Sequence, residues 1–258
     1  MALNKKNYLV FVGSGRTGST LLGQLLNKHP NIAISSELRV ITNAFNKNKK
    51  VKKYLKEILR VSSTESSVPH KYIENDKNPQ FLKWQKDWVI PEINFSEKYP
   101  KEKILIYGDK KQGGNTQAFI QDENKVWDLL SGLKLKFISI NRHPYSVLNS
   151  YKNVGFDIDD YVDEYIEIQK KANKIIQQQN GLSLYYEELL SSPSKTLIDT
   201  FNFLECNIED QFIEDLITLI KKTKINESID LPQEIRQKVD KNLPELINFY
   251  NGKNGLNT

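Results

Sequence analysis

The sequence has very little cysteine: Cys206 is the single one among 258 residues. A lone cysteine excludes an internal disulfide and a metal cluster of several thiolates, and it favours a reducing compartment. Long hydrophobic runs are missing too, so no stretch predicts a membrane-spanning helix. The apolar run near the N-terminus is short and leads directly into a glycine-rich turn, which favours a β-strand over a signal peptide. We therefore expect a cytoplasmic protein.

Length and charge set further bounds. A hydrophobic content of 38% in 258 residues is enough for one sizeable core, and we expect a single domain over 1–258. The net charge of +5 suits a polyanionic ligand, although acidic residues are nearly as many as basic ones and the basic ones are scattered. No motif that alternates aromatic and basic residues favours nucleic acid. We find no internal repeat and no disordered linker.

Residues 8–29 read YLVFVGSGRTGSTLLGQLLNKH: an apolar run, a glycine-rich turn, then leucines at helical spacing. Glycines in such a turn take positive φ and let backbone N–H groups surround an anion, and the positive end of the following helix adds to the attraction. Two hydroxyl groups follow at the expected helix start. The residues concerned are Gly13, Gly15, Gly18, Ser19 and Thr20. The pattern predicts a strand, a phosphate loop and a helix; a tight turn without a ligand is the alternative.

The nucleotide-binding pattern G-x-x-x-x-G-K-[ST] fits at three positions, but Ser19 stands where an NTPase has its phosphate-binding lysine. The cation lies inside the loop instead, at Arg16. This arrangement resembles the 5′-phosphosulfate loop of sulfotransferases that use 3′-phosphoadenosine 5′-phosphosulfate (PAPS). The resemblance implies that the donor's phosphosulfate binds to Gly15, Arg16, Thr17, Gly18, Ser19 and Thr20.

A second candidate site follows in HPNIAISSELRV, residues 29–40, where Pro30 ends the first helix and a short strand leads to a polar turn. In parallel sheets ligands bind beyond the carboxyl ends of strands, so Glu37 in this turn can face the phosphate loop. The segment resembles tyrosylprotein sulfotransferases, in which a His-Pro pair precedes a Glu-x-Arg turn. The resemblance implies that Glu37 is the base for the acceptor hydroxyl. A surface glutamate that caps the next helix is the alternative.

The stretch KILIYGDKKQ, residues 103–112, predicts a buried strand that ends in a polar turn. In sulfotransferases the corresponding strand ends in a lysine on the transferring sulfuryl group. Lys110 is the best match, and Lys111 stays open because Gln112 replaces the usual proline. The cytosolic branch has its histidine base near Gln112, so a glutamine here favours Glu37. An ordinary exposed lysine is the alternative.

The stretch KLKFISINRHPYSVLNSYKN, which begins at Lys134, follows a helix expected over 116–130. It predicts a strand with Arg142 at its carboxyl end and a helix opened by Pro144, with Ser150 nearly two turns in. The spacing resembles the 3′-phosphate site of PAPS-dependent sulfotransferases, which implies that Arg142 and Ser150 hold that phosphate. An arginine fork suits a phosphate. A salt-bridge partner and a packing serine are the alternatives.

Beyond a long amphipathic helix over 155–179, the stretch SLYYEELLSSPSKTLIDTFNFLE predicts a strand, a turn and a helix that begins at Pro193. Its pattern Y-E-x-L resembles the family segment whose tyrosine lies near the adenine. That role falls on Tyr186, and a half-buried core aromatic is the alternative. The C-terminal part predicts two helices separated by KKTKINESIDLP, where Lys221, Lys222 and Lys224 are candidates to cover the nucleotide.

Residues 44–103 predict a helical insertion on the acceptor side. Two interpretations of its basic piece at 47–57 stay open: it attracts an acidic acceptor, or it has no binding role. Trp84 and Trp88 share a predicted helix face, and the role of His70 is open.

Together the motifs predict a P-loop NTPase-like three-layer α/β/α domain with a central parallel sheet, a helical insertion and a helical C-terminus. The resemblance implies a PAPS-dependent sulfotransferase that needs no metal, releases adenosine 3′,5′-bisphosphate (PAP) and acts on an unidentified hydroxyl or amine acceptor. Two alternatives remain: a P-loop kinase or NTPase, and a non-catalytic nucleotide-binding protein of the same fold. Neither the acceptor nor the oligomeric state can be read from the sequence.

Overall fold

The structure is a computed structural model that describes residues 6–62, 98–220 and 229–254. The predictions made for His70, for Trp84 and Trp88, and for Lys221, Lys222 and Lys224 lie outside the described residues.

A five-stranded sheet, parallel throughout, forms the centre of the molecule, in the order β2-β3-β1-β4-β5. The strands are β1 (Asn7–Phe11), β2 (Ile32–Ser36), β3 (Ile106–Lys110), β4 (Lys134–Asn141) and β5 (Leu182–Tyr185). The register pairs Val10 with Asp109 of β3 and with Phe137 of β4. Because all strands run the same way, their carboxyl ends share one edge of the sheet. The prediction of a parallel α/β/α fold is confirmed.

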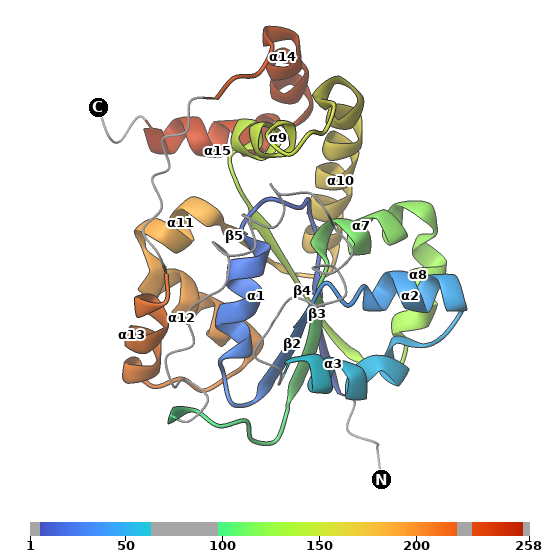
Figure 1. Cartoon of the computed structure of the whole chain (residues 1–258), viewed down its shortest axis with the longest axis vertical. Helices are drawn as coiled ribbons and strands as arrows, with labels where there is room; N and C mark the ends of the chain where they lie inside the picture. Colours follow the sequence, from blue (N-terminus) through green and yellow to red (C-terminus); the bar gives the residue numbers. More distant parts are fainter. Residues whose placement is uncertain (1–5, 63–97, 221–228, 255–258) are drawn as a thin grey trace.

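Both faces of the sheet are buried. Side chains of β1 alternate between two apolar clusters: Leu9 and Phe11 pack with α1 (Ser19–Asn27), α12 (Pro193–Leu204) and α13 (Asp210–Thr218). Tyr8 and Val10 pack on the other face with α2 (Val40–Lys47), α7 (Gln112–Gln121), α8 (Glu123–Leu130) and α10 (Ile158–Gln178). Figure 1 shows these two helical layers on either side of the strands. Period-two burial of a central strand is the physical basis of the three layers.

A third cluster lies beyond the sheet edge. It joins the first half of α10 to α9 (Pro144–Lys152), α14 (Gln233–Asn242) and α15 (Pro244–Asn254), which Figure 1 shows at the top. Pro144 is the first residue of α9, as its fixed φ favours, and the His143 side chain accepts from the Tyr145 amide. A short α11 (Tyr186–Ser191) follows β5 directly.

Three helical boundaries differ from expectation. The helix expected over 116–130 is two, α7 and α8, because Asp122 has extended backbone and its carboxylate accepts from the Lys125 amide as a new N-cap. Tyr186 begins a helix, whereas the pattern predicts strand and turn. The C-terminal part described has three helices, one before residues 221–232 and two after them, since Leu243 separates α14 from α15.

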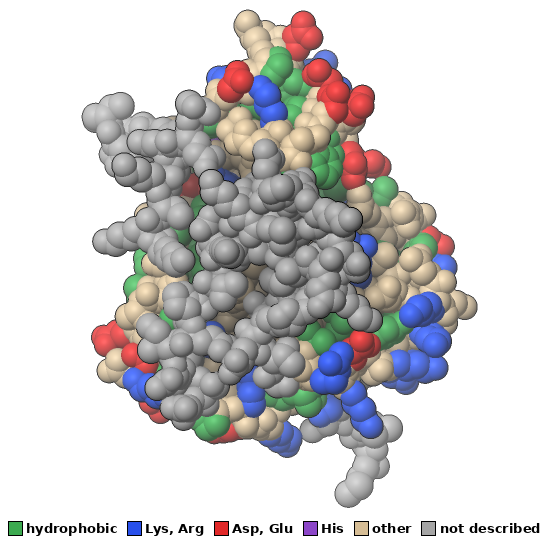
Figure 2. Space-filling model, in the orientation of Figure 1, with side chains coloured by type: hydrophobic (Ala, Val, Ile, Leu, Met, Phe, Trp, Pro, Cys, Tyr) green, Lys and Arg blue, Asp and Glu red, His purple; other side chains and the backbone are tan. Residues whose placement is uncertain are grey.

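The described part of the predicted insertion consists of the end of α2, η1 (Val51–Tyr54), α3 (Leu55–Ser62) and the chain from residue 98. Val51 and Ile58 are fully buried in the second cluster, so residues up to 62 pack against the sheet. Their outer surface is strongly basic, with Lys47, Lys52 and Lys53 exposed. Figure 2 shows Lys and Arg side chains gathered where Figure 1 places α2 and α3.

Candidate functional site

The loop between β1 and α1 has the backbone of an anion site. Gly13 and Gly18 have φ of 124° and 90°, and Arg16 lies in the left-handed region at 65°. Gly18 is the N-cap of α1 and has no side chain to cap it, so the first-turn N–H groups point beyond the helix end. Positive φ and an open helix N-terminus are what an anion site requires.

The loop is held from behind by α7. Gln112 is buried, and its Nε2 donates to the carbonyls of Ser14 and Ile140 at 2.9 and 3.0 Å and to Thr17 Oγ1 at 3.3 Å. The Thr116 hydroxyl accepts from the Gly13 amide at 2.8 Å. The Thr17 hydroxyl itself is fully buried and bonded to the Ser14 carbonyl, so this side chain serves the loop.

Glu37 lies one residue beyond β2, in a turn with unusual backbone. Its φ is 60° and that of Arg39 is 56°, a region that non-glycine residues avoid. The Glu37 amide donates to the Lys110 carbonyl at 3.1 Å, which ties the turn to the end of β3. The position matches the expectation that Glu37 stands at the carboxyl edge of the sheet.

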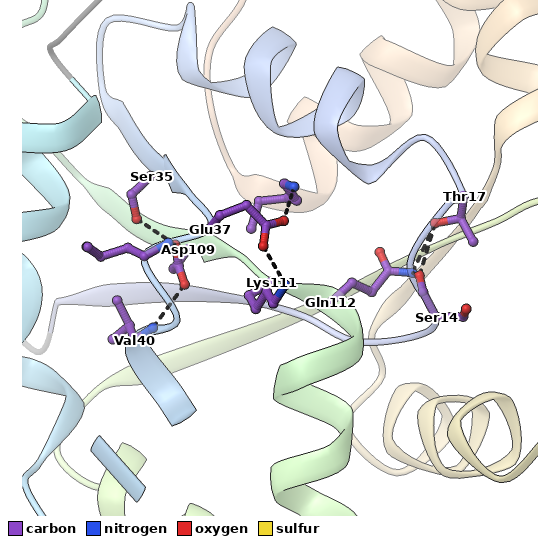
Figure 3. A network of polar contacts seen from close by, with 10 residues as sticks. Ser14, Thr17, Ser35, Glu37, Val40, Asp109, Lys111 and Gln112 are labelled. Carbon is purple, nitrogen blue, oxygen red and sulfur yellow. Dashed lines mark hydrogen bonds and ion pairs between the residues drawn. The ribbon is translucent and has the colours of Figure 1, made fainter. Parts of the chain in front are cut away.

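Two lysines bind the carboxylate of Glu37. Lys110 Nζ lies 2.5 Å from Oε1 and Lys111 Nζ lies 2.5 Å from Oε2, and Figure 3 shows this contact for Lys111. Burial acts to raise the pKa of Glu37, but the charges and hydrogen bonds of the two lysines outweigh it and lower the pKa. Glu37 is therefore ionised at neutral pH.

Of the two predicted 3′-phosphate residues, Ser150 on α9 contacts the loop directly, whereas Arg142 beyond β4 contacts Tyr186, which packs on the loop. Arg16 Nε donates to Ser150 Oγ at 3.0 Å. The Arg142 guanidinium lies 5.1 Å from the centre of the Tyr186 ring, and a Cβ on Gly18 would lie 2.3 Å from Cδ2 of that ring. Thus Tyr186 packs directly on the loop, and Arg142 lies over its ring.

A cavity of about 640 Å³ opens beside these groups. Its wall holds four basic side chains against two acidic ones, so its charge suits an anion. Tyr151, Phe156 and Tyr161 form an aromatic wall, with ring centres 4.3 to 5.5 Å apart. The predicted site residues on the wall are Gly15, Arg16, Ser19, Thr20, Glu37 and Lys110, together with Lys111.

The structure thus brings the predicted site residues to one edge of the sheet. One group lies on the cavity wall, and Ser150 contacts Arg16 of that group. Arg142 and Gly18 contact Tyr186, and Thr17 is buried within the loop. Sequence reasoning missed Asp109, the brace formed by Gln112 and Thr116, and the aromatic wall. Asp109 gave a signal, since it directly precedes Lys110 at a strand end. The aromatic residues follow Ser150, but nothing in their spacing shows that they line the same cavity as Glu37.

In the parts of the chain that are described, no cluster of three or more His, Cys, Asp or Glu side chains is arranged to hold a metal ion. Among the same residues no helix has the length and apolar character that crossing a bilayer requires.

No family model matches the sequence, and no curated protein matches it. The chain is similar to the sulfotransferase domain of the Synechococcus PCC 7002 olefin synthase: 20% identity, 88% of this chain and 84% of that one covered, TM-score 0.46. It is similar to the sulfotransferase domain of the curacin biosynthetic pathway, with 16% identity, 93% and 98% covered, and a TM-score of 0.47. A third similar structure is retinol dehydratase in complex with retinol and PAP, with 14% identity, 96% and 82% covered, and a TM-score of 0.44. At these identities the function has to be argued from the chain's own residues.

Proposed function

We propose that this protein is a sulfotransferase that moves the sulfuryl group of PAPS to an acceptor hydroxyl or amine and releases PAP. The observation that carries the proposal is that Ser150 and Tyr186, from two distant parts of the chain, both contact the phosphate loop: Arg16 Nε donates to Ser150 Oγ, and the Tyr186 ring packs on Gly18. An NTPase that binds ATP has no 3′-phosphate, so it would not need Ser150 and Arg142 beside its phosphate loop.

The residues fit the donor. The loop amides and the start of α1 suit the phosphosulfate. Arg142, next to the carboxyl end of β4, supplies a planar fork for the 3′-phosphate, and Ser150 is a hydroxyl donor beside it. The Tyr186 ring offers a flat surface near the loop for the adenine.

The acceptor chemistry falls to Glu37 and its lysines. The acceptor oxygen forms a bond to sulfur while the bond from sulfur to the bridging phosphate oxygen breaks, and Glu37 takes the acceptor proton. Lys110 is nearly buried, with 6% of its side chain exposed, and we assign it to the charge that develops on the sulfuryl oxygens. Arg16 and the hydroxyl groups of Ser19 and Thr20 stabilise the leaving phosphate.

The P-loop kinase alternative needs a carboxylate for Mg²⁺ as well as the missing lysine. Asp109, at the end of the strand next to β1, is a carboxylate in a suitable strand position. Its two oxygens accept from the Ser35 hydroxyl and from the amides of Leu38 and Val40, so the turn already uses them. This arrangement disfavours a metal role for Asp109.

Calorimetry with PAP and ADP tests the donor. We expect the wild type to bind PAP more tightly than ADP. In Arg142→Ala the ratio of the two affinities should fall about 10-fold or more, because a charged hydrogen-bond partner is removed. Equal binding of the two nucleotides would contradict the proposal. Transfer is then tested with sulfur-labelled PAPS and a panel of acceptors, where Glu37→Gln should abolish turnover and leave PAP affinity nearly intact.

A further inference from the structure

One buried carboxylate, that of Asp109, binds the turn that contains Glu37. Asp109 is 1% exposed, and its Oδ1 accepts from the Ser35 hydroxyl at 2.8 Å and from the Leu38 amide at 3.0 Å. Its Oδ2 accepts from the Val40 amide at 3.0 Å. Figure 3 shows Asp109 between Ser35 and Val40, with Glu37 above it. A single side chain of β3 therefore binds the Ser35 hydroxyl before Glu37 and two backbone amides after it.

These bonds are needed because the turn is strained. Glu37 and Arg39 both lie in the left-handed region, at φ of 60° and 56°. L-residues leave such a conformation unless surrounding contacts enforce it. The amides that Asp109 binds, those of Leu38 and Val40, directly follow these two residues. Val40 is the first residue of α2, so the Asp109 carboxylate, which belongs to β3, also caps the N-terminus of that helix.

Burial of the Asp109 carboxylate beside this turn costs free energy. Burial, with a smaller effect from the nearby Glu37 charge, raises its pKa to about 6, although three hydrogen bonds act to lower it. The Asp109 charge also adds to the burial that raises the pKa of the Tyr8 hydroxyl on β1. Because its folded pKa lies above the ordinary value, the contribution of Asp109 to stability is greatest at low pH and is lost as the pH rises through about 6.

We propose that Asp109 is a positioning residue for Glu37: it holds the strained turn so that the Glu37 carboxylate meets Lys110 and Lys111 at the edge of the cavity. The assignment rests on the proposed function for its kinetic consequence, but its geometric part does not. Asp109→Asn is the most specific substitution. The amide matches the shape of the carboxylate but presents N–H where the Val40 amide needs an acceptor.

The test is the carboxyl titration of Glu37, followed by ¹³C NMR in protein labelled at glutamate. In Asp109→Asn we expect the pKa of Glu37 to rise toward its usual range, because the displaced carboxylate loses its lysine contacts. Loss of the Asp109 charge alone would act in the opposite direction, since removal of a neighbouring anion lowers a carboxyl pKa. A Glu37 pKa that stays or falls overturns the proposal.

Two further variants guard the interpretation. Ser35→Ala removes one bond to Asp109 and leaves both amide bonds, so it should move the Glu37 titration in the same direction by less. Asp128→Asn is the matched control, because Asp128 is 67% exposed and pairs with Lys50 on the surface; it should leave the titration unchanged. If Asp109→Asn does not fold, Ser35→Ala carries the test, and an unchanged Glu37 titration there overturns the proposal.

Kinetics separate this role from a merely structural one. Once labelled PAPS has identified an acceptor, Asp109→Asn should lower kcat about 10- to 100-fold, the usual effect of a catalytic group displaced by about 1 Å, with PAP affinity unchanged. Its thermal midpoint at pH 7 should stay near that of the wild type, since removal of a buried charge offsets the lost bond. A wild type that binds no PAP would refute the proposed function and leave the Glu37 titration as a valid test. An unchanged kcat in an active enzyme would overturn the inference alone.

Discussion

Arg16 and Ser150 are joined by a hydrogen bond of 3.0 Å from Nε to Oγ, although 134 positions separate them in the chain. One residue belongs to the loop predicted to hold the phosphosulfate and the other to the helix predicted to hold the 3′-phosphate. The two predicted phosphate sites are therefore physically connected. A nucleotide that carries phosphate at both ends of its ribose would bind to both at once.

Ser150→Ala tests this connection. The substitution removes the donor that we propose for the 3′-phosphate and one contact of the Arg16 side chain, so PAP affinity should fall about 10-fold. Binding of ADP, which has no 3′-phosphate, should change much less. Calorimetry measures both, with Ser192→Ala as the control because Ser192 is an exposed serine that is not among the predicted site residues. An equal loss for PAP and ADP would contradict the assignment of Ser150.

The lysine pair on Glu37 predicts a pH dependence. Lys110 and Lys111 lower the pKa of Glu37, so the base stays ionised and kcat/KM should hold constant as the pH falls to the ordinary glutamate range. Lys111→Met should raise that pKa and move the acid limb of the profile to higher pH, with the plateau retained. Lys110→Met should move the limb too and also lower the plateau, by about 100-fold, because the sulfuryl contact that we propose for Lys110 is lost.

The profiles decide which lysine serves the sulfuryl group, which the sequence leaves open. A lowered plateau in Lys111→Met but not in Lys110→Met would reverse the assignment. The same pKa has a consequence for stability: a depressed carboxyl pKa contributes stability above its ordinary value, and that contribution is lost as the pH falls through the lowered one. The thermal midpoints of wild type and Glu37→Gln should therefore converge in strong acid.

Gly18→Ala addresses the contact between the loop and Tyr186. Gly18 has φ of 90°, and an added Cβ would lie 2.3 Å from Cδ2 of the tyrosine ring. Gly132 has a similar φ of 84° with nothing within 4 Å, so Gly132→Ala measures the backbone strain alone, about 1 to 2 kcal/mol. Gly18→Ala should destabilise clearly more in thermal unfolding and should lose PAP binding, whereas Gly132→Ala should keep it. Equal effects would show that the ring can move aside.

The sequence was sufficient for the strands, the loop and the residues at the strand ends, because burial period and glycine spacing are local signals. Glu37, Lys110 and Arg142 could be placed at one edge once the sheet was taken as parallel. What joins them could not be predicted, since the bonds of Asp109 depend on the register that pairs it with Ser35 of β2. The capped break at Asp122 was missed because the helical pattern continues on both sides of it.

Gln112 shows the same limit of the sequence, because its contacts depend on the fold. In the sequence, Gln112 was notable only because sulfotransferases have a proline or a nearby histidine base at this point. In the fold, its amide donates to two backbone carbonyls and to Thr17. Gln112→Glu keeps the shape and removes every donor, so a buried acid would face oxygen atoms. We expect a loss of about 3 kcal/mol in the free energy of unfolding and weaker PAP binding. Gln121→Glu, at an exposed position of the same helix, should change both little. If Gln112→Glu unfolds like the wild type in denaturant, the loop is held by other contacts and Gln112 is not its brace.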